Sequence, residues 1–287
     1  MALELVPAKP EHIPELGRIC YEAFKDLADR HGFPTDFASA AFARMVTGSL
    51  VQSESVYAVT AMVDGQVSGS NFLSVHDEVG GVGPISVEVP LQGSGLGRAL
   101  MVSVMDHARE SGLDKVRLMQ DAFNVRSLAL YASLGFHTRT PCAVMQPLPP
   151  EAVDATIRPV TEKDLDDIED LSRRLYKVSR RNEVAGSLSG PFRPFLRERN
   201  GRIVGYFSLG LAGHGVAETD EDALSLVGES SRGTPLDMAR FFCPLTNASL
   251  YRTFLSAGCR NVKVMNLMTV GPYEEPEGCW LPGVISG

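Results

Sequence analysis

The stretch Gln92-Gly93-Ser94-Gly95-Leu96-Gly97-Arg98 decides the fold of this chain. It follows an alternating run, residues 85–89, that is typical of a strand, and it opens a pattern typical of a helix. A glycine-rich turn between a strand and a helix predicts a cradle for a phosphate group, because the backbone can approach a ligand closely where no Cβ intervenes. The unpaired N–H groups of the first helical turn would then point at the anion.

Three glycine-rich signatures compete for this turn. The P-loop requires G-x-x-x-x-G-K-[ST], and here Arg98 follows Gly97 with no Lys-Ser or Lys-Thr. The dinucleotide signature requires G-x-G-x-x-G, whereas the glycines here run G-x-G-x-G, so Asp121 near the end of the next predicted strand leaves only a weak case for it. The third signature is the [QR]-x-x-G-x-[GA] loop for the pyrophosphate of coenzyme A, which Gln92, Gly95 and Gly97 match. A plain strand–helix turn is the alternative without a ligand.

A capped helix is predicted downstream of this loop. Asn124 suits the N-cap and Gly135 suits the C-terminal stop. Between them, Leu128, Tyr131 and Leu134 recur at about helical spacing. The segment therefore predicts a short amphipathic helix that begins immediately after a polar cap.

Loop and helix together resemble the GNAT acetyltransferase superfamily. In that family an acyl-CoA loop is followed by a strand and then by a helix of the form N-x-x-[SA]-x-x-[LF]-Y-x-x-x-G-F. The resemblance covers roughly residues 55–145, with both motifs in the expected order. One departure is visible, because only Leu91 separates Pro90 from Gln92 where the family usually has two residues. This departure concerns the entry into the loop.

The resemblance implies an acyl-CoA-dependent N-acyltransferase that moves acetyl from acetyl-CoA to an amine by direct attack. The backbone N–H groups of Val87 and Val89 are then expected to hold the pantetheine arm and the carbonyl. Tyr131 matches the family's general acid for the sulfur, and Asn124 matches a pantetheine contact. The complete set of coenzyme A contacts that the resemblance implies is Val87, Val89, Gln92, Gly93, Ser94, Gly95, Leu96, Gly97, Arg98, Asn124, Ser127 and Tyr131.

The general base is predicted to be Glu88. Its side chain alternates away from Val87 and Val89 on the strand and so faces the substrate side. His76, near the end of the preceding strand, is the alternative. Each candidate also has an ordinary explanation, since Glu88 suits an exposed strand position and His76 suits the surface. The ordinary explanation for Tyr131 is a core aromatic, and it is weaker than the catalytic one.

Composition narrows the class of protein. The chain has 287 residues and a formal net charge of −8, which argues against nonspecific nucleic-acid binding. Its N-terminus carries no signal-peptide pattern, and no apolar run is long enough to span a membrane. Five scattered cysteines without C-x-x-C indicate a reduced, cytoplasmic setting, and no histidine spacing supports a metal site. The expected partners are acetyl-CoA and an unidentified amine, without nucleic acid or membrane; a homodimer is left open.

The chain repeats in outline. Residues 6–16 recur as 158–168, the Asp64-Gly65 hairpin signal recurs as Asn200-Gly201, and the helix after Asn124 recurs after Asn247. Gly69 to Asn124 spans 55 residues, whereas Gly205 to Asn247 spans 42, so the second copy lacks 13 residues in the interval that holds the loop. That interval instead holds an acidic run, residues 218–222, which would repel a pyrophosphate.

The predicted fold is α/β (α+β), with two tandem GNAT-like domains, each a mixed, mostly antiparallel sheet flanked by helices. Residues 1–148 form the acetyltransferase domain with the acyl-CoA loop, 149–287 form the degenerate copy, and a proline-rich linker joins them at 146–150. In the first copy, strands are expected at about 3–6, 56–63, 66–76, 82–89, 115–120 and 136–146, and helices at 11–30, 35–48, 95–111 and 125–134.

Three questions stay open at this stage. The basic stretch 173–202 holds nine Arg and Lys against two Glu, and it suits either a solvated face or a surface that attracts an anionic substrate or acidic partner. The acceptor is a small amine, an amino-acid-like molecule, or a protein N-terminus or lysine. The rivals to an enzyme of this family are a non-catalytic acyl-CoA-binding regulatory protein and, with less support, a dinucleotide-binding oxidoreductase; the presence of Tyr131 favours the enzyme.

Overall fold

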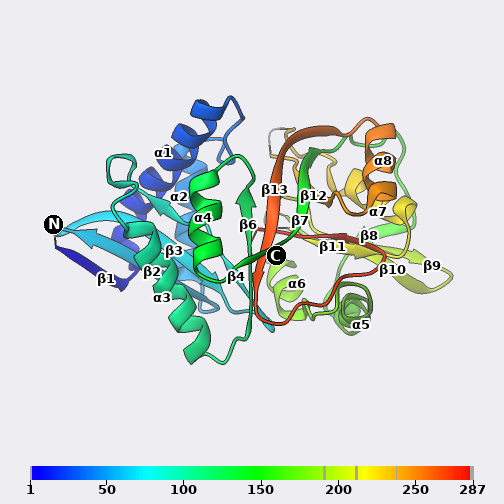
Figure 1. Cartoon of the computed structure of the whole chain (residues 1–287). Coiled ribbons are helices and arrows are strands. Elements are labelled where there is room, and N and C mark those ends of the chain that lie inside the picture. Colours follow the sequence, from blue (N-terminus) through cyan, green and yellow to red (C-terminus); the bar gives the residue numbers. More distant parts are fainter. Residues whose placement is uncertain (1, 190–191, 211–212, 237, 285–287) are drawn as a thin grey trace.

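A computed structural model of the chain describes residues 2–189, 192–210, 213–236 and 238–284. It contains a nine-stranded and a five-stranded sheet with helices packed against them (Figure 1). The N-terminal half comprises β1 (Leu3–Pro7), α1 (Ile13–His31), α2 (Ala40–Gln52), β2 (Val56–Val63), β3 (Gln66–Ser74), β4 (Val79–Val82), β5 (Ser86–Val87), the 3₁₀ turn η2 (Val89–Leu91), α3 (Leu96–Glu110), β6 (Lys115–Asp121), α4 (Val125–Ser133) and β7 (His137–Gln146).

The C-terminal half repeats this order in outline, and most of its elements are shorter. It comprises β8 (Ile157–Pro159), α5 (Leu165–Tyr176), α6 (Arg181–Ser187), β9 (Phe195–Arg199), β10 (Arg202–Phe207), β11 (Gly215–Ala217), α7 (Asp220–Ser230), β12 (Phe241–Pro244), α8 (Ala248–Ser256), β13 (Arg260–Val270) and β14 (Cys279–Leu281). Two further 3₁₀ turns, Pro10–His12 and Glu162–Asp164, precede α1 and α5.

Both predicted hairpins are confirmed. Asp64 and Gly65 have φ of 48° and 81°, and Asn200 and Gly201 have φ of 54° and 71°. These are the left-handed conformations that a two-residue turn needs to match the twist of its strands. They join β2 to β3 and β9 to β10.

The expected continuous strand over 82–89 is wrong. The segment forms two short strands, β4 and β5, and then the turn η2. Pro84 lies between the strands and has no N–H to donate to a ladder, so the pairing is interrupted there. The helix that follows agrees with the prediction, since α3 buries Leu96, Leu100, Val104 and Ala108.

The two halves exchange strands. The nine-stranded sheet runs β1-β2-β3-β4-β6-β13-β7-β12, with β5 paired to β3. The strand at 136–146 was expected to complete the first copy, but β7 pairs with β13 and β12, and β13 takes the place beside β6. Figure 1 shows β13, in orange, among the green strands at the centre of the molecule. The division at residue 148 stays a prediction, because the nine-stranded sheet contains strands from both sides of it.

The second copy is short where it was expected to be. Only Glu218 and Thr219 lie between β11 and α7, whereas residues 88–95 lie between β5 and α3. The Thr219 side chain accepts a hydrogen bond from Asp222 N and caps α7 directly. The C-terminal half therefore begins this helix without a glycine-rich loop.

Candidate active site

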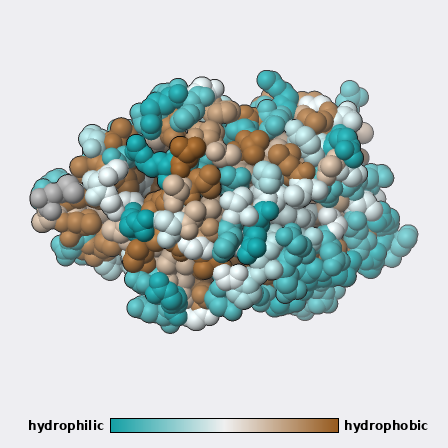
Figure 2. Space-filling model, in the orientation of Figure 1, coloured by the Kyte–Doolittle hydropathy of each residue, from teal (hydrophilic) through white to brown (hydrophobic). Residues whose placement is uncertain are grey.

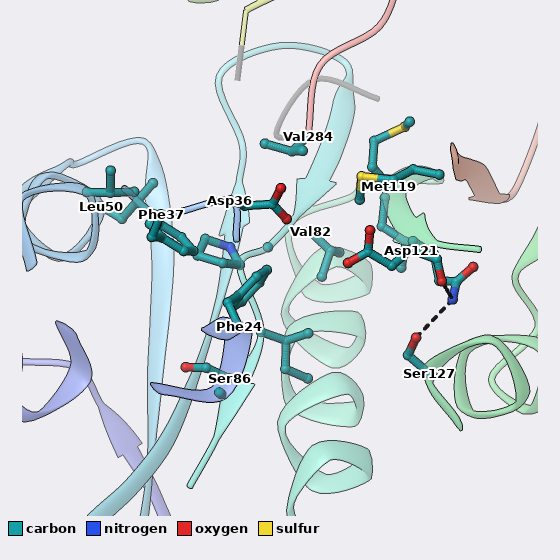
Figure 3. A pocket seen from close by; sticks show the side chains of 18 of the residues that line it. Phe24, Asp36, Phe37, Leu50, Val82, Ser86, Met119, Asp121, Ser127 and Val284 are labelled. Carbon is teal, nitrogen blue, oxygen red and sulfur yellow. Dashed lines mark hydrogen bonds between the residues drawn. The ribbon is translucent and has the colours of Figure 1, made fainter. Parts of the chain in front are cut away.

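A cavity of about 1010 Å³ extends from the glycine-rich loop to the C-terminal half. Figure 3 shows Phe24, Phe37 and Leu50 on one side of it and Asp121 and Ser127 on the other. Side chains from both halves of the chain line it, so the cavity is a product of the assembled molecule. Of the residues predicted from the sequence, its lining includes Val87, Gln92, Gly93, Gly95, Gly97, Arg98, Asn124, Ser127 and Tyr131.

The cavity enters the sheet where two strands separate. β4 and β5 both pair with β3, but on the other side the parallel ladder of β4 with β6 ends at Gly81 and Arg117. Glu88 N donates to Ser68 O at 2.9 Å. Because hydrogen bonding alternates along an antiparallel strand, the N–H and C=O of Val87 point away from β3 and into this opening. The backbone donor predicted at Val87 is thus directed at the cavity.

The glycine-rich loop has the backbone that its sequence requires. Gly93 and Gly95 have φ of 89° and 98°, and residues other than glycine rarely adopt such values. A Cβ built on Gly95 would meet nothing within 4 Å, so the space above this residue is open. The Gln92 side chain donates through Nε2 to Val87 O at 3.3 Å and ties the loop to β5.

Two guanidinium groups lie beside this loop. Arg98 Nη2 donates to Ser133 Oγ at 2.6 Å, which links α3 to the end of α4. Arg126, in the first turn of α4, has Nη1 4.0 Å from the position of a Cβ on Gly93, and both arginines line the cavity. Paired guanidinium groups suit a pyrophosphate. Arg126 was not among the residues predicted from the sequence, although its position two residues after the cap Asn124 was a signal.

Helix α4 is built as its sequence predicts. Asn124 Oδ1 accepts from Ser127 N at 3.2 Å, and Gln120 Nε2 donates to Ser127 Oγ at 3.0 Å (dashed in Figure 3). Tyr131 is only 7% exposed, and burial, with a smaller effect of the Asp121 charge, raises the pKa of its phenol. The phenol therefore stays protonated at neutral pH, as a proton donor must.

Other predicted site residues lie away from the cavity. Glu88 Oε1 accepts from Arg18 Nη2 at 3.1 Å, and Glu88 is not among the described residues that line the cavity. Val89, in η2, is 36% exposed and does not belong to the described lining either; nor do Ser94 and Leu96. The catalytic role of Glu88 and the donor role of Val89 thus remain predictions without support from the cavity.

The C-terminal half contributes a polar group to the cavity wall. Glu183 Oε1 lies 3.5 Å from His214 Nδ1, and His214 Nε2 lies 3.1 Å from the hydroxyl of Tyr206. Burial opposes ionisation of Glu183, but His214 and the charge of Arg180 lower the pKa of this carboxyl to about 2. Glu183, His214 and the alternative base His76 all line the cavity.

Comparison with known proteins agrees with this geometry. Residues 18–136 match the model of the acetyltransferase (GNAT) family. Residues 18–136 of this chain therefore form a GNAT-family segment. A solved structure from Pyrococcus horikoshii, assigned as an acetyltransferase, superposes with a TM-score of 0.78 at 14% identity and covers 99% of this chain and 96% of that one. A GCN5-related N-acetyltransferase from Sphaerobacter thermophilus superposes with a TM-score of 0.61 at 16% identity, over 96% and 97% of the chains. The GNAT fold therefore extends over both halves.

The curated relatives are similar over a shorter segment. Mycothiol acetyltransferase from Thermomonospora curvata is 42% identical over 88 residues, which are 30% of this chain and 29% of that relative. The match thus spans less than a third of the relative's length. It supports the family assignment and leaves the activity of the whole chain to be proposed.

The basic stretch 173–202 is neutralised by acidic side chains of the same chain. Eight of its nine cations form ion pairs, and Arg193 donates to Val160 O. Glu218 pairs with Arg174 and Arg202, and Asp222 pairs with Arg197 and Arg199, so the acidic run meets the basic one. Figure 2 shows the resulting hydrophilic surface on the side where α5 and β9 lie. The structure favours a solvated, internally paired face over a surface for an anionic substrate.

The described residues provide neither a cluster of metal ligands nor a membrane-spanning helix. No group of three or more His, Cys, Asp or Glu side chains in the described part of the chain is placed to hold a metal ion. Among the helices of residues 2–189, 192–210, 213–236 and 238–284, none is both long and apolar enough to cross a membrane. All five cysteines are free and buried.

Proposed function

We propose that this GNAT protein is an acetyl-CoA-dependent N-acetyltransferase that acts on a small amine. One observation carries the proposal: a single cavity is lined by the glycine-rich loop, by Val87 and Tyr131, and by side chains of the C-terminal half. A thioester held along β5 and an amine bound beyond it would meet in this cavity. The name of the curated relatives supports acetyl transfer, while their 88 shared residues are too few to bring their acceptor to this chain.

The residues at the cavity have three proposed roles: binding of the pyrophosphate, activation of the thioester and contact with the pantetheine arm. The loop from Gln92 to Arg98, with Arg126, binds the pyrophosphate through backbone N–H groups and two guanidinium charges. Val87 N–H polarises the thioester carbonyl, and Tyr131 protonates the sulfur that leaves. Asn124 and Ser127 contact the pantetheine arm at the start of α4.

The acceptor is proposed to be small because the C-terminal half covers the far part of the cavity. Phe192 and Leu209 line it from that side, and Phe24 and Phe37 line it from the N-terminal half. Apolar walls on both sides suit a compact amine with apolar parts better than the terminus of a folded protein.

The test is a screen for thiol release. The full chain is titrated with acetyl-CoA by calorimetry and then mixed with acetyl-CoA and a panel of small amines, with free thiol followed by a colorimetric reagent. We expect one acetyl-CoA site per chain and release of thiol that depends on one class of amine. Acetyl-CoA binding without release across amines, amino acids and N-terminal peptides would indicate the regulatory rival. Binding of NAD in place of acetyl-CoA would indicate an oxidoreductase.

Tyr131→Phe is expected to lower turnover about 10²-fold with acetyl-CoA affinity unchanged, because the ring packing stays and only the proton donor is lost. Single-turnover kinetics and calorimetry measure the two quantities. The matched control is Tyr57→Phe, since Tyr57 bonds Ser103 Oγ at 3.0 Å and lies outside the described lining of the cavity. Equal single-turnover rates for Tyr131→Phe and the wild type would remove Tyr131 from the acid role.

A further inference from the structure

Three charged side chains from distant parts of the chain meet beside the cavity. Lys263, on the exchanged strand β13, is 4% exposed, and its Nζ lies 2.7 Å from Asp36 Oδ2 and 2.7 Å from Asp121 Oδ1. Asp36 and Asp121 line the cavity, whereas Lys263 is not among its described lining residues. In Figure 3 the two carboxylates point toward one another across the pocket. The ammonium group thus joins two carboxylates of the N-terminal half from the other half.

Asp121 lies where the reaction is proposed to occur. It is the last residue of β6, four residues beyond Arg117, where β6 leaves the ladder with β4. β6 therefore carries Asp121 to the edge of the opening that faces β5. The charge of Asp121 also contributes to the raised pKa of Tyr131, which places the two groups in one electrostatic environment.

The charges around Asp121 make it the more available of the two carboxylates. Asp36 is approached by two cations, because Arg240 Nη1 lies 3.5 Å from its Oδ1 in addition to Lys263. Asp121 pairs with Lys263, and His31 has only a smaller electrostatic effect on it. Burial raises the pKa of Asp121, and the opposing attraction of Lys263 does not cancel it. Burial also disfavours the charge on Lys263, but the two carboxylates outweigh it and raise the pKa of the amine, so Lys263 stays an ammonium.

The other candidate bases are less well placed. Glu88 is paired with Arg18 outside the cavity. His76 lines the cavity, but its Nδ1 is already hydrogen-bonded to Ser74 Oγ at 2.7 Å. His214 has both ring nitrogens near Glu183 and Tyr206.

We propose that Asp121 is the general base for the acceptor, and that Lys263, with Asp36, is the positioning group that holds it. The inference rests on the proposed acetyltransferase function. The acceptor ammonium gives one proton to the Asp121 carboxylate, and the free amine attacks the thioester carbon as the C–S bond breaks. The nitrogen loses its second proton to solvent water, and solvent returns one proton to Tyr131 after Tyr131 has protonated the leaving sulfur. One proton is released per turnover when Asp121 ionises again.

The test compares two carboxylate-to-amide changes. Asp121→Asn is expected to lower kcat about 10²-fold or more at neutral pH, with acetyl-CoA affinity by calorimetry unchanged. The deficit should shrink as pH rises, because an acceptor that is already a neutral amine needs no base. In the wild type, kcat should fall on the acid side of its pH profile at a pH above about 3.9, the pKa of an ordinary aspartate. This acid limb should be absent in the variant. Asp106→Asn, an exposed change on α3 where Asp106 pairs with Arg109, is the matched control.

The outcomes separate the inference from the function. An active wild type with an equally active Asp121→Asn would overturn the base, as would a deficit that is constant across pH. A loss in Glu88→Gln without one in Asp121→Asn would assign the base to Glu88. If Asp121→Asn does not fold, Asp121→Glu is tested in its place, because it retains the carboxylate. Asp121→Glu should keep the acid limb of the pH profile with a reduced kcat, and loss of that limb would contradict the proposal. No thiol release by the wild type with any amine would instead remove the proposed function.

Discussion

Gly95→Glu is expected to abolish acetyl-CoA binding while the fold survives. Gly95 is the N-cap of α3 at φ 98°, and a side chain there would extend into open space, so the backbone strain of about 1–3 kcal/mol is the main cost to folding. The added carboxylate would occupy the anion site and repel the pyrophosphate by about 1–4 kcal/mol per charge pair at 4 Å. We expect a loss of affinity of about 10²-fold or more, equivalent to about 2.8 kcal/mol.

Gly95→Asn is the matched control for this change. Asparagine tolerates a positive φ better than other side chains and carries no charge, so it reproduces the substitution without the repulsion. Calorimetry with acetyl-CoA, together with thermal melts of each variant, separates binding from folding. Unchanged affinity in folded Gly95→Glu would refute the loop assignment. A wild-type stoichiometry of two that falls to one in the variant would show a second acyl-CoA site in the C-terminal half.

Residues 1–148 alone are not expected to fold into a stable acetyltransferase domain. Cutting the chain after residue 148 removes β13 from β6, so the six residue pairs from Met265–Asp121 to Val270–Val116 are lost. It also leaves β7 without β12 and β13, its two partner strands. Met268 of β13 also belongs to the hydrophobic core around Leu100. Unpaired strand edges and exposed apolar surface predict aggregation or a loosely packed state.

The control for this truncation is a chain that is divided after residue 148 with both fragments present. Fragments 1–148 and 149–287, produced together, should assemble through the exchanged strands and regain one acetyl-CoA site. Circular dichroism melts, dye binding to exposed apolar surface and calorimetry compare the fragment, the pair and the intact chain. A cooperative melt and acetyl-CoA binding by 1–148 alone would show that the exchange is dispensable.

Local patterns were enough to predict most elements and the loop. Alternation, helical spacing and turn residues act over a few neighbouring positions, which is why both hairpins, helix α3 with its buried face, and the capped helix α4 lie where they were expected. The shorter second copy followed from counting residues between recurring motifs. The break at Pro84 was also readable in principle, because a residue without an N–H weakens a strand.

Only the tertiary structure decided which strands pair and which carboxylates meet. The two halves have similar strands, so either β7 or β13 could complete the edge of β6, and no local pattern distinguishes them. The exchange brings Lys263 to Asp36 and Asp121, residues that are 227 and 142 positions away in the chain. Tertiary packing within the N-terminal half, between α1 and the end of β5, places Glu88 beside Arg18, and Glu88 is not among the described residues that line the cavity. Such contacts between distant segments arise from packing of the whole chain, and a pattern read along the sequence carries no record of them.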